Sequence, residues 1–175
     1  MIILGLILIV FVLVFMAFRG KTRAKTFVPQ AGVIETATFH GLTFAYDSKY
    51  QLEDGKQSIT VRLDPWAANL TIHHGNISGF SKAQVDKYSE LMDAAMFGDH
   101  VTTNAQEFSE IIAGRNATGR SCTMFIDGYP FYHLMLTFNT STSWFGIVYM
   151  CSKAAKNAED TLDEFLAILA SITSD

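Results

Sequence analysis

An unbroken run of seventeen residues without charge or proline, Ile2–Phe18, constrains this chain more than any other feature of its sequence. As a helix rising about 1.5 Å per residue, the run would span roughly 26 Å, just enough for the hydrocarbon core of a bilayer. Lipid offers no hydrogen-bond partner to an open backbone, so a helix is the structure expected there. We therefore predict a transmembrane helix over residues 1–18, with residues 2–18 in contact with the lipid bilayer.

Three interpretations of this segment compete. A cleaved secretory signal starts with basic residues and ends in a small-x-small site. This chain starts Met1-Ile2-Ile3, and the run ends Met16-Ala17-Phe18-Arg19. A type IV pilin carries a glutamate early in its helix, which this run lacks. The third interpretation, a retained signal-anchor of a single-pass membrane protein, is favoured.

Four cations follow the run within seven residues: Arg19, Lys21, Arg23 and Lys25. Positive charge flanking a membrane helix favours the cytoplasmic side. We therefore expect membrane orientation to be set by these residues, with the C-terminal domain in the cytoplasm at the cell membrane. The same cations could contact anionic head groups. Residues 19–36 are interpreted as this basic stop sequence followed by a short tether.

The rest of the chain is acidic. From Glu35 onward, 9 Lys and Arg stand against 17 Asp and Glu, a balance of −8. Such a domain is poorly suited to phosphate backbones, so no nucleic-acid partner is expected. Residues 37–175 are long enough for one folded domain.

Alternating apolar and polar residues predict strands in this domain. The clearest are Thr38–Tyr46, Ser58–Leu63, Asn69–His74, Arg120–Ile126, Tyr129–Phe138 and Trp144–Cys151, with Glu107–Ala113 as a weaker candidate. Asp127-Gly128 lies between two of these runs and predicts a hairpin.

Two amphipathic helices are also predicted. Ser81 and Gln84 have the spacing of a capping box and begin the first, whose apolar residues recur every three or four positions up to about Gly98. The second lies between Lys153 and Ile172. The hairpins require antiparallel pairing, and each helix must bury one face. The expected fold class is α+β, a mainly antiparallel sheet of about six strands with two flanking helices after the transmembrane helix.

Three stretches give this arrangement a family likeness. They are Leu42–Tyr46 followed by Tyr50, the segment from Gly128-Tyr129 onward, and Phe165–Ile172. Together they resemble the opening strand, central hairpin and closing helix of the PsbP-like family. This α/β/α sandwich is shared by an extrinsic photosystem II subunit, a Ran-binding transport regulator and small membrane-tethered bacterial proteins. The resemblance implies a non-enzymatic binding or accessory domain and brings no catalytic residues with it.

No catalytic or metal-binding motif stands out. His73 and His74 are adjacent on a predicted strand and point to opposite faces, so they cannot share a metal directly. Cys122 with His133 could form a thiolate–imidazole pair. Cys122, however, lies in a strand of core character, where cysteine usually acts as a small hydrophobe. We expect no catalytic residue, no metal and no cofactor.

Aromatic residues near strand ends are the remaining candidates for a site. Trp66, Tyr129, Phe131 and Trp144 could line a partner or ligand surface, although core packing would also explain them. Four Asn-x-Ser/Thr sequons begin at Asn69, Asn76, Asn116 and Asn139, and none would be used in a cytoplasmic domain.

Two functions from different classes follow. The first is a single-pass, membrane-anchored, non-enzymatic module that presents an acidic PsbP-like domain to a protein partner at the membrane. The alternative is a small-ligand sensor or carrier that uses an aromatic-lined cleft between sheet and helix. A thiol-dependent hydrolase acting through Cys122 is a distant third.

Overall fold

The computed structural model describes residues 32–64, 68–98, 100–155 and 158–174. The predicted transmembrane helix and the four cations after it lie outside these residues. Within them, neither helix is long and apolar enough to cross a membrane.

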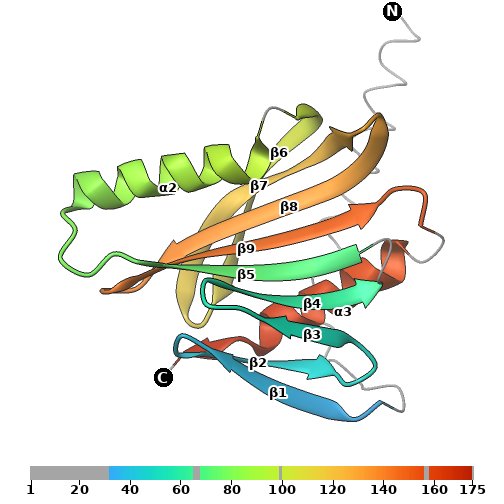
Figure 1. Ribbon diagram of the computed structural model, residues 1–175, viewed down its shortest axis with the longest axis horizontal. Coiled ribbons are helices and arrows are strands. Elements are labelled where there is room, and N and C mark those ends of the chain that lie inside the picture. Colours follow the sequence, from blue (N-terminus) through green and yellow to red (C-terminus); the bar gives the residue numbers. More distant parts are fainter. Residues whose placement is uncertain (1–31, 65–67, 99, 156–157, 175) are drawn as a thin grey trace, which may run out of the picture.

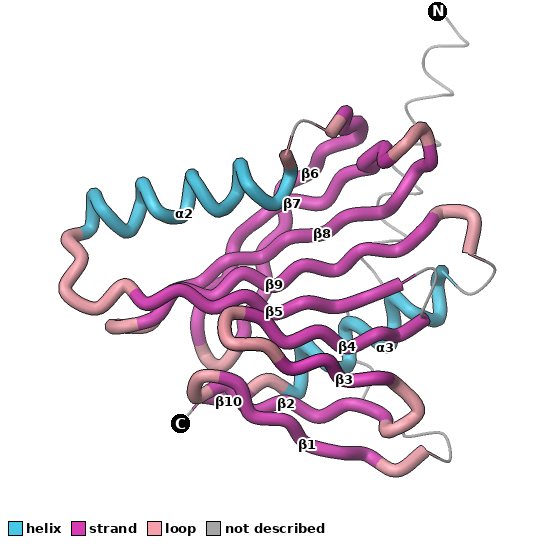
Figure 2. The backbone as a smooth tube through the Cα atoms, in the orientation of Figure 1, coloured by secondary structure: helices cyan, strands magenta, loops and turns pink. Residues whose placement is uncertain are grey.

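The described chain forms ten strands and two helices (Figures 1 and 2). In chain order these are β1 (Ile34–Phe39), β2 (Leu42–Asp47), β3 (Gln51–Asp54), β4 (Ser58–Asp64), β5 (Ala68–Asn76), α2 (Lys82–Phe97), β6 (Val101–Ile112), β7 (Arg115–Ile126), β8 (Tyr129–Asn139), β9 (Ser143–Ser152), α3 (Ala158–Ser171) and β10 (Thr173–Ser174).

Two antiparallel sheets organise the domain. The larger has seven strands in the order β3-β4-β5-β9-β8-β7-β6, and the smaller has the order β1-β2-β10. One core cluster joins α3 and the small sheet to one face of the large sheet, and a second lies under α2 on the other face. The α+β class, the antiparallel pairing and the two helices are as predicted. The strands are more numerous than the predicted six.

The predicted strand Thr38–Tyr46 is in fact a hairpin. His40 and Gly41 both have positive φ, 50° and 82°, and join β1 to β2 in a two-residue turn. A single alternating strand would place Phe39 on the face opposite Leu42, whereas this turn pairs the two residues on one buried face, so the alternation changes phase here. β1 begins at Ile34, so Ile34–Thr36, assigned from sequence to the tether, belong to the small sheet.

Two short strands were missed because most of their side chains are exposed. β3 lies within a segment predicted as a polar turn, and its side chains are mostly exposed. It is the edge strand of the large sheet, paired only with β4. β10 has two residues and pairs with β2. Strands without a buried face carry no hydrophobic alternation, so pattern reading does not find them.

Helix α2 begins as predicted. The Gln84 amide donates to the Ser81 hydroxyl at 3.4 Å, and the Ser81 amide donates to the Gln84 side chain at 2.8 Å, which completes the capping box. The helix meets the sheet through few side chains, and Phe97 is its only fully buried residue. Near its other end, the Tyr88 ring lies edge-on to Trp144 with centroids 5.6 Å apart.

Two glycines allow α2 to lie close to the sheet at this contact. A side chain at Gly75 of β5 would overlap the Tyr88 ring, and one at Gly146 of β9 would overlap the Trp144 indole. The bare backbone at both places therefore allows the two aromatic rings to pack closely against the sheet.

Helix α3 packs more deeply than α2. Phe165 stacks on Tyr149 of β9 with centroids 4.6 Å apart, and Ile168 and Leu169 are also buried. Burying side chains of this size stabilises a fold by about 1.5–3 kcal/mol each. The Ser171 hydroxyl accepts from the Ala45 amide at 2.9 Å, which attaches the end of α3 to β2.

One end of the sandwich, which we call the entry end, is the end at which the described chain enters the domain. Here the Ser48 amide donates to the Val33 carbonyl at 2.9 Å, so the described chain enters at this end. Strands β2, β4, β7 and β9 finish here, and β1, β3, β5, β6, β8 and α3 begin here, on the right of Figure 1.

Candidate functional site

A surface pocket of about 620 Å³ lies at the entry end, between the β3–β4 edge and the start of α3. Its lining residues are Lys49, Tyr50, Gln51, Arg62, Leu63, Asp160, Thr161 and Glu164. The lining holds two cations and two carboxylates, so it differs from the aromatic-lined cleft expected from the sequence.

The loop from β2 to β3 places one wall of this pocket. Asp47, which is buried, accepts the Lys49 amide on its side chain at 2.9 Å and the Tyr50 amide on its carbonyl at 3.0 Å. A carboxylate that holds the next amides in this way fixes a tight turn. The turn directs the side chains of Lys49 and Tyr50 towards α3.

Helix α3 places the opposite wall. Thr161 is buried, donates to the Ala158 carbonyl at 3.0 Å, and lies 3.0 Å from the Tyr149 hydroxyl. This contact fixes the first turn of the helix against β9. Glu164 follows three residues later, on the neighbouring part of the same helical face, and so points towards the loop.

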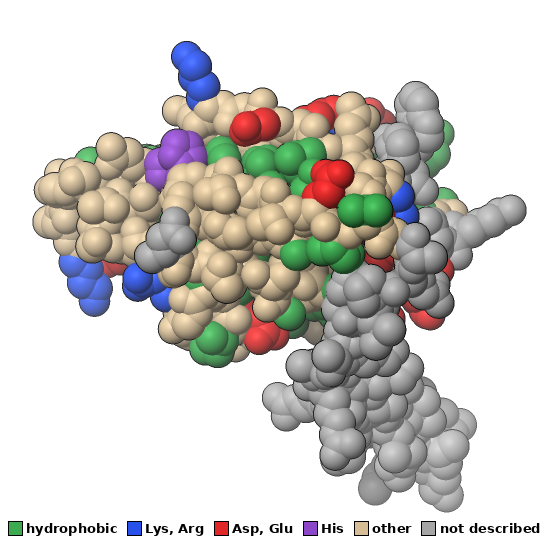
Figure 3. Space-filling model, turned by 90° about the horizontal axis from the view of Figure 1, so that it is seen from below, with side chains coloured by type: hydrophobic (Ala, Val, Ile, Leu, Met, Phe, Trp, Pro, Cys, Tyr) green, Lys and Arg blue, Asp and Glu red, His purple; other side chains and the backbone are tan. Residues whose placement is uncertain are grey.

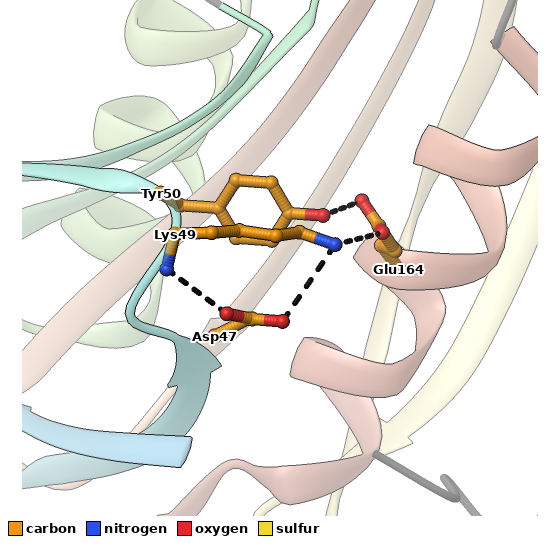
Figure 4. Close-up of polar contacts among 4 residues, drawn as sticks. All are labelled: Asp47, Lys49, Tyr50 and Glu164. Atoms are coloured by element: carbon orange, nitrogen blue, oxygen red, sulfur yellow. Dashed lines mark hydrogen bonds and ion pairs between the residues drawn. The ribbon is translucent and has the colours of Figure 1, made fainter. Parts of the chain in front are cut away.

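Glu164 joins the two walls (Figure 4). One of its oxygens accepts from the Lys49 ammonium at 2.9 Å, and the other accepts from the Tyr50 hydroxyl. The Lys49 ammonium also lies 3.6 Å from Asp47. The hydrogen bond to Glu164 raises the pKa of Lys49 above its usual value. Glu164 thereby links β2–β3 to α3 across 114 residues of sequence.

The remaining charges of the pocket differ in how they are paired. Arg62 binds Glu53 on β3 through two hydrogen bonds of 2.7 and 2.8 Å, and this pairing lowers the pKa of Glu53. Asp160 is exposed and forms no ion pair with any residue in the described part of the chain. Chemically, the pocket offers one unpaired carboxylate and the outer edge of a guanidinium to a small charged ligand.

The geometry opposes thiol catalysis. Cys122 and His133 are directly opposite each other on β7 and β8, and both are buried. Burial raises the pKa of Cys122. Burial, with the nearby charges of Arg120 and His100, lowers the pKa of His133 to about 4. A thiolate–imidazolium pair needs shifts of the opposite sign, so this pair favours neutral, structural side chains.

Metal binding finds no support in the described residues, which contain no group of three or more His, Cys, Asp or Glu side chains arranged to hold an ion. His40 and His74 do come together, but as parallel rings with centroids 3.7 Å apart. Imidazole lone pairs lie in the ring plane, so stacked rings do not converge on one metal. His74 instead lies 3.1 Å from the Ser143 hydroxyl.

The aromatic residues proposed from sequence as a partner or ligand surface do not form one site. Trp66 lies outside the described residues. Trp144 is fully buried under α2, so it presents no surface to a partner. Phe131 is half-buried, and Tyr129 is 69% exposed at the start of β8. None of the described three lines the pocket.

The pocket residues were missed because nothing in the sequence marks them. Lys49 and Tyr50 occur in a polar loop, and Glu164 is on the polar side of an amphipathic helix, where charge is ordinary. The one local signal is Asp47 ahead of Lys49, a turn-forming residue. Viewed from the β1 side, apolar and acidic side chains are scattered and do not form one extended patch (Figure 3).

Comparison with known structures defines the fold of this chain. No family profile matches the sequence, and no curated protein sequence matches it. The fold, however, is PsbP-like, as the sequence motifs predicted. Its similarity extends over most of a solved PsbP-like protein.

That protein is cyanobacterial PsbP (CyanoP) from Synechocystis sp. PCC 6803. The TM-score is 0.55 at 13% identity, covering 86% of this chain and 99% of the cyanobacterial protein. A protein from Bacteroides thetaiotaomicron VPI-5482 matches with a TM-score of 0.53, also at 13% identity, over 83% of this chain. The match covers 49% of that protein, so this chain spans about half its length.

Proposed function

We propose that this protein is a single-pass, membrane-anchored, non-enzymatic binding or accessory protein. Residues 2–18 hold it in the cell membrane, and the acidic PsbP-like domain contacts a protein partner there from the cytoplasmic side. The observation that carries the proposal is that the most reactive side chains lie in the hydrophobic core. Cys122, Cys151 and His133 are buried in structural packing, while the charged pocket and strand edges remain open to solvent.

The anchoring half of the proposal is tested by fractionation. Full-length protein and a version starting at residue 32 are expressed with the same C-terminal tag, and membranes are washed with alkaline carbonate and with high salt. We expect the full-length chain to stay in the membrane pellet and the shortened chain to be soluble, because the attachment is hydrophobic. Full-length protein in the soluble fraction would refute the anchor.

The partner half is tested in intact membranes. A photo-crosslinking amino acid replaces one residue in each of three variants. The positions are Asp160 in the pocket lining, Gln106 on the β6 edge and, as the control, Lys87 on the exposed side of α2. A binding module should give one discrete adduct from one surface and none from α2. Absence of any adduct at all three positions would count against a protein partner.

The small-ligand alternative has one observation in its favour, the charged pocket. Its unpaired Asp160 would attract an amine, and a ligand that binds the native state raises the melting temperature by mass action. A thermal-shift screen of small amines and amino acids against the domain tests this. The Asp160→Asn variant should lose any stabilisation, whereas Glu159→Gln, on the neighbouring exposed acid, should retain it.

A further inference from the structure

Five apolar side chains gather at the entry end, around the hairpin between β7 and β8. They are Val101, Phe125, Ile126, Tyr129 and Pro130, which we call the hairpin-end patch. The strand register places them on both sides of the hairpin tip: Phe125 pairs with both Val101 and Pro130 on one face of the sheet, and Ile126 pairs with Tyr129 on the opposite face. Val101 and Tyr129 are 67% and 69% exposed, and the other three are half-buried.

The chain enters the domain at the same end as this patch. The described residues start at Gly32, and the predicted membrane helix ends at residue 18, so thirteen residues, 19–31, separate the two. Fully extended, thirteen residues reach at most about 45 Å. The seven strands of the large sheet, spaced by about 4.8 Å, make a rim of roughly 29 Å. Every strand end on this rim is therefore within reach of the bilayer surface.

We infer that the hairpin-end patch rests on the head-group region of the bilayer that holds the anchor, with the Tyr129 ring at the interface. The inference depends on the proposed membrane anchoring and adds an orientation to it. Tyrosine suits this position because its ring is apolar and its hydroxyl stays hydrated. Ile126, its cross-strand partner, provides aliphatic surface beside it, and Val101 and Pro130 do so on the other face of the hairpin tip.

A bilayer fits the patch better than a second copy of the chain does. Stable protein interfaces bury about 800 Å² on each partner, more than five partly buried side chains can offer. A weak contact with lipid suffices here because the anchor keeps the bilayer at a high effective concentration next to this end of the domain.

The charges around the patch indicate the kind of lipid contact. In the described part of the entry end, carboxylates outnumber cations; the carboxylates are Glu35, Asp47, Asp127, Glu159, Asp160 and Glu164, and the cations are Lys49, Arg62 and Lys153. This mixed, slightly acidic rim gives no attraction to anionic lipid. The patch should therefore contact zwitterionic lipid equally well, and high salt should not release it.

The test places a fluorophore on the patch of the full-length protein in phosphatidylcholine nanodiscs. Tyr129→Cys is labelled with an environment-sensitive dye. The matched control is Ser141→Cys, an exposed position in the β8–β9 turn at the opposite end. The unsubstituted protein gives the background from Cys122 and Cys151, which are buried.

Lipids carrying a shallow doxyl quencher then report depth. We expect about a twofold loss of emission at position 129, since an interfacial contact lies within about 10 Å of the acyl boundary. At position 141 we expect no loss. Adding salt, or replacing part of the lipid with phosphatidylglycerol, should leave both results unchanged.

The other outcomes separate this inference from the anchoring on which it rests. Protein that stays with the nanodisc, but shows no quenching at position 129, refutes the orientation and leaves the anchor standing. Protein that does not enter nanodiscs refutes both. Dye protection at position 129 that increases with protein concentration, without doxyl quenching, identifies a second copy as the occupant and overturns the lipid contact.

Discussion

A single buried histidine gives this domain its clearest dependence on acid. His133 is 2% exposed, its ring lies 4.6 Å from that of Phe97, and its Nδ1 has no hydrogen-bond partner among the described residues. Burial and the charges of Arg120 and His100 lower its pKa from 6.5 to about 4. At neutral pH the folded protein therefore holds His133 uncharged.

We expect the domain to lose stability as the pH falls from about 6.5 to 4. In this window the unfolded chain binds a proton at His133 that the folded chain does not. The free energy of unfolding therefore decreases as the pH is lowered. A pKa shift of this size corresponds to a loss of at most about 3 kcal/mol in the free energy of unfolding. Urea midpoints at pH 7.5 and 4.5 measure the loss.

The His133→Leu variant should show a much smaller loss between these two pH values. The control is His40→Asn, which changes an exposed histidine whose charge is not among those acting on His133, so its loss should stay close to that of the original protein. An unchanged pH dependence in His133→Leu would show that other groups are responsible.

The carboxylate of Glu164 should make a modest contribution to stability. It accepts from Tyr50 and Lys49, but the Lys49 side chain is 55% exposed, and exposed ion pairs contribute at most about 1 kcal/mol. For Glu164→Gln we expect a total loss of about 1–2 kcal/mol, since the half-buried hydrogen bond from Tyr50 also weakens.

A double-mutant cycle of Tyr50→Phe with Glu164→Ala, which removes the acceptor, isolates that hydrogen bond. Equilibrium denaturation of the four proteins should give a coupling energy of about 0.5–1.5 kcal/mol. Strictly additive losses would mean that the two side chains do not interact in solution.

Among the elements, α2 is the least firmly attached. Its contact with the sheet depends on buried Phe97 at its end and on Tyr88 against Gly75 and Trp144. It also depends on three further side chains that are only partly buried, Val85, Met92 and Met96. We expect Tyr88→Ala to destabilise the domain by about 1–3 kcal/mol and to speed hydrogen exchange within the helix. Leu91→Ala, a control on the same helix with a 58% exposed side chain, should change stability by less than about 0.5 kcal/mol.

The elements also show what the sequence could predict. Local signals worked where one residue type has one structural meaning, as with the Ser81–Gln84 capping box and the Asp127-Gly128 hairpin turn. They failed at His40-Gly41, because a single change of phase in the alternation, between Phe39 and Leu42, is a weak signal within an otherwise regular run. β3 was missed because an edge strand needs no apolar residues.

The candidate site was beyond prediction for a different reason. Its central contact joins Tyr50 to Glu164, two common polar residues that only the completed sandwich brings together. The aromatic side chains chosen from sequence were conspicuous, but Trp144 uses its size to fill the space under α2. Burial depends on which elements stack, and that information is not local.

In the whole molecule, the two faces of the large sheet differ in how firmly they are covered, and each contains one cysteine. Cys122 belongs to the core under α2, and Cys151 to the core under α3. One residue of α2 is fully buried, compared with four of α3. The α2 side should therefore open more readily under native conditions.

Pulsed alkylation followed by mass spectrometry tests this difference. With rates corrected for the reactivity of each thiol in denaturant, we expect Cys122 to react at least about tenfold faster than Cys151, a difference of ~1.4 kcal/mol. Equal rates would mean that both faces open only in global unfolding. A chain that takes up no label even in denaturant would contain a disulfide.

The pairing of β5 with β9 also sets the order in which the domain can be built. Ala68 pairs with Cys151, and β2 pairs with residues as late as Ser174, so the first half of the chain completes its sheets only with the last residues. During synthesis, β1–β5 must wait with their apolar side chains uncovered, while β6–β9 can form a meander from neighbouring hairpins. Ribosome-stalled chains with residues up to 157 exposed should remain sensitive to protease, and those with residue 174 exposed should become resistant. The pairing of β10 with β2 is therefore also the last step of assembly.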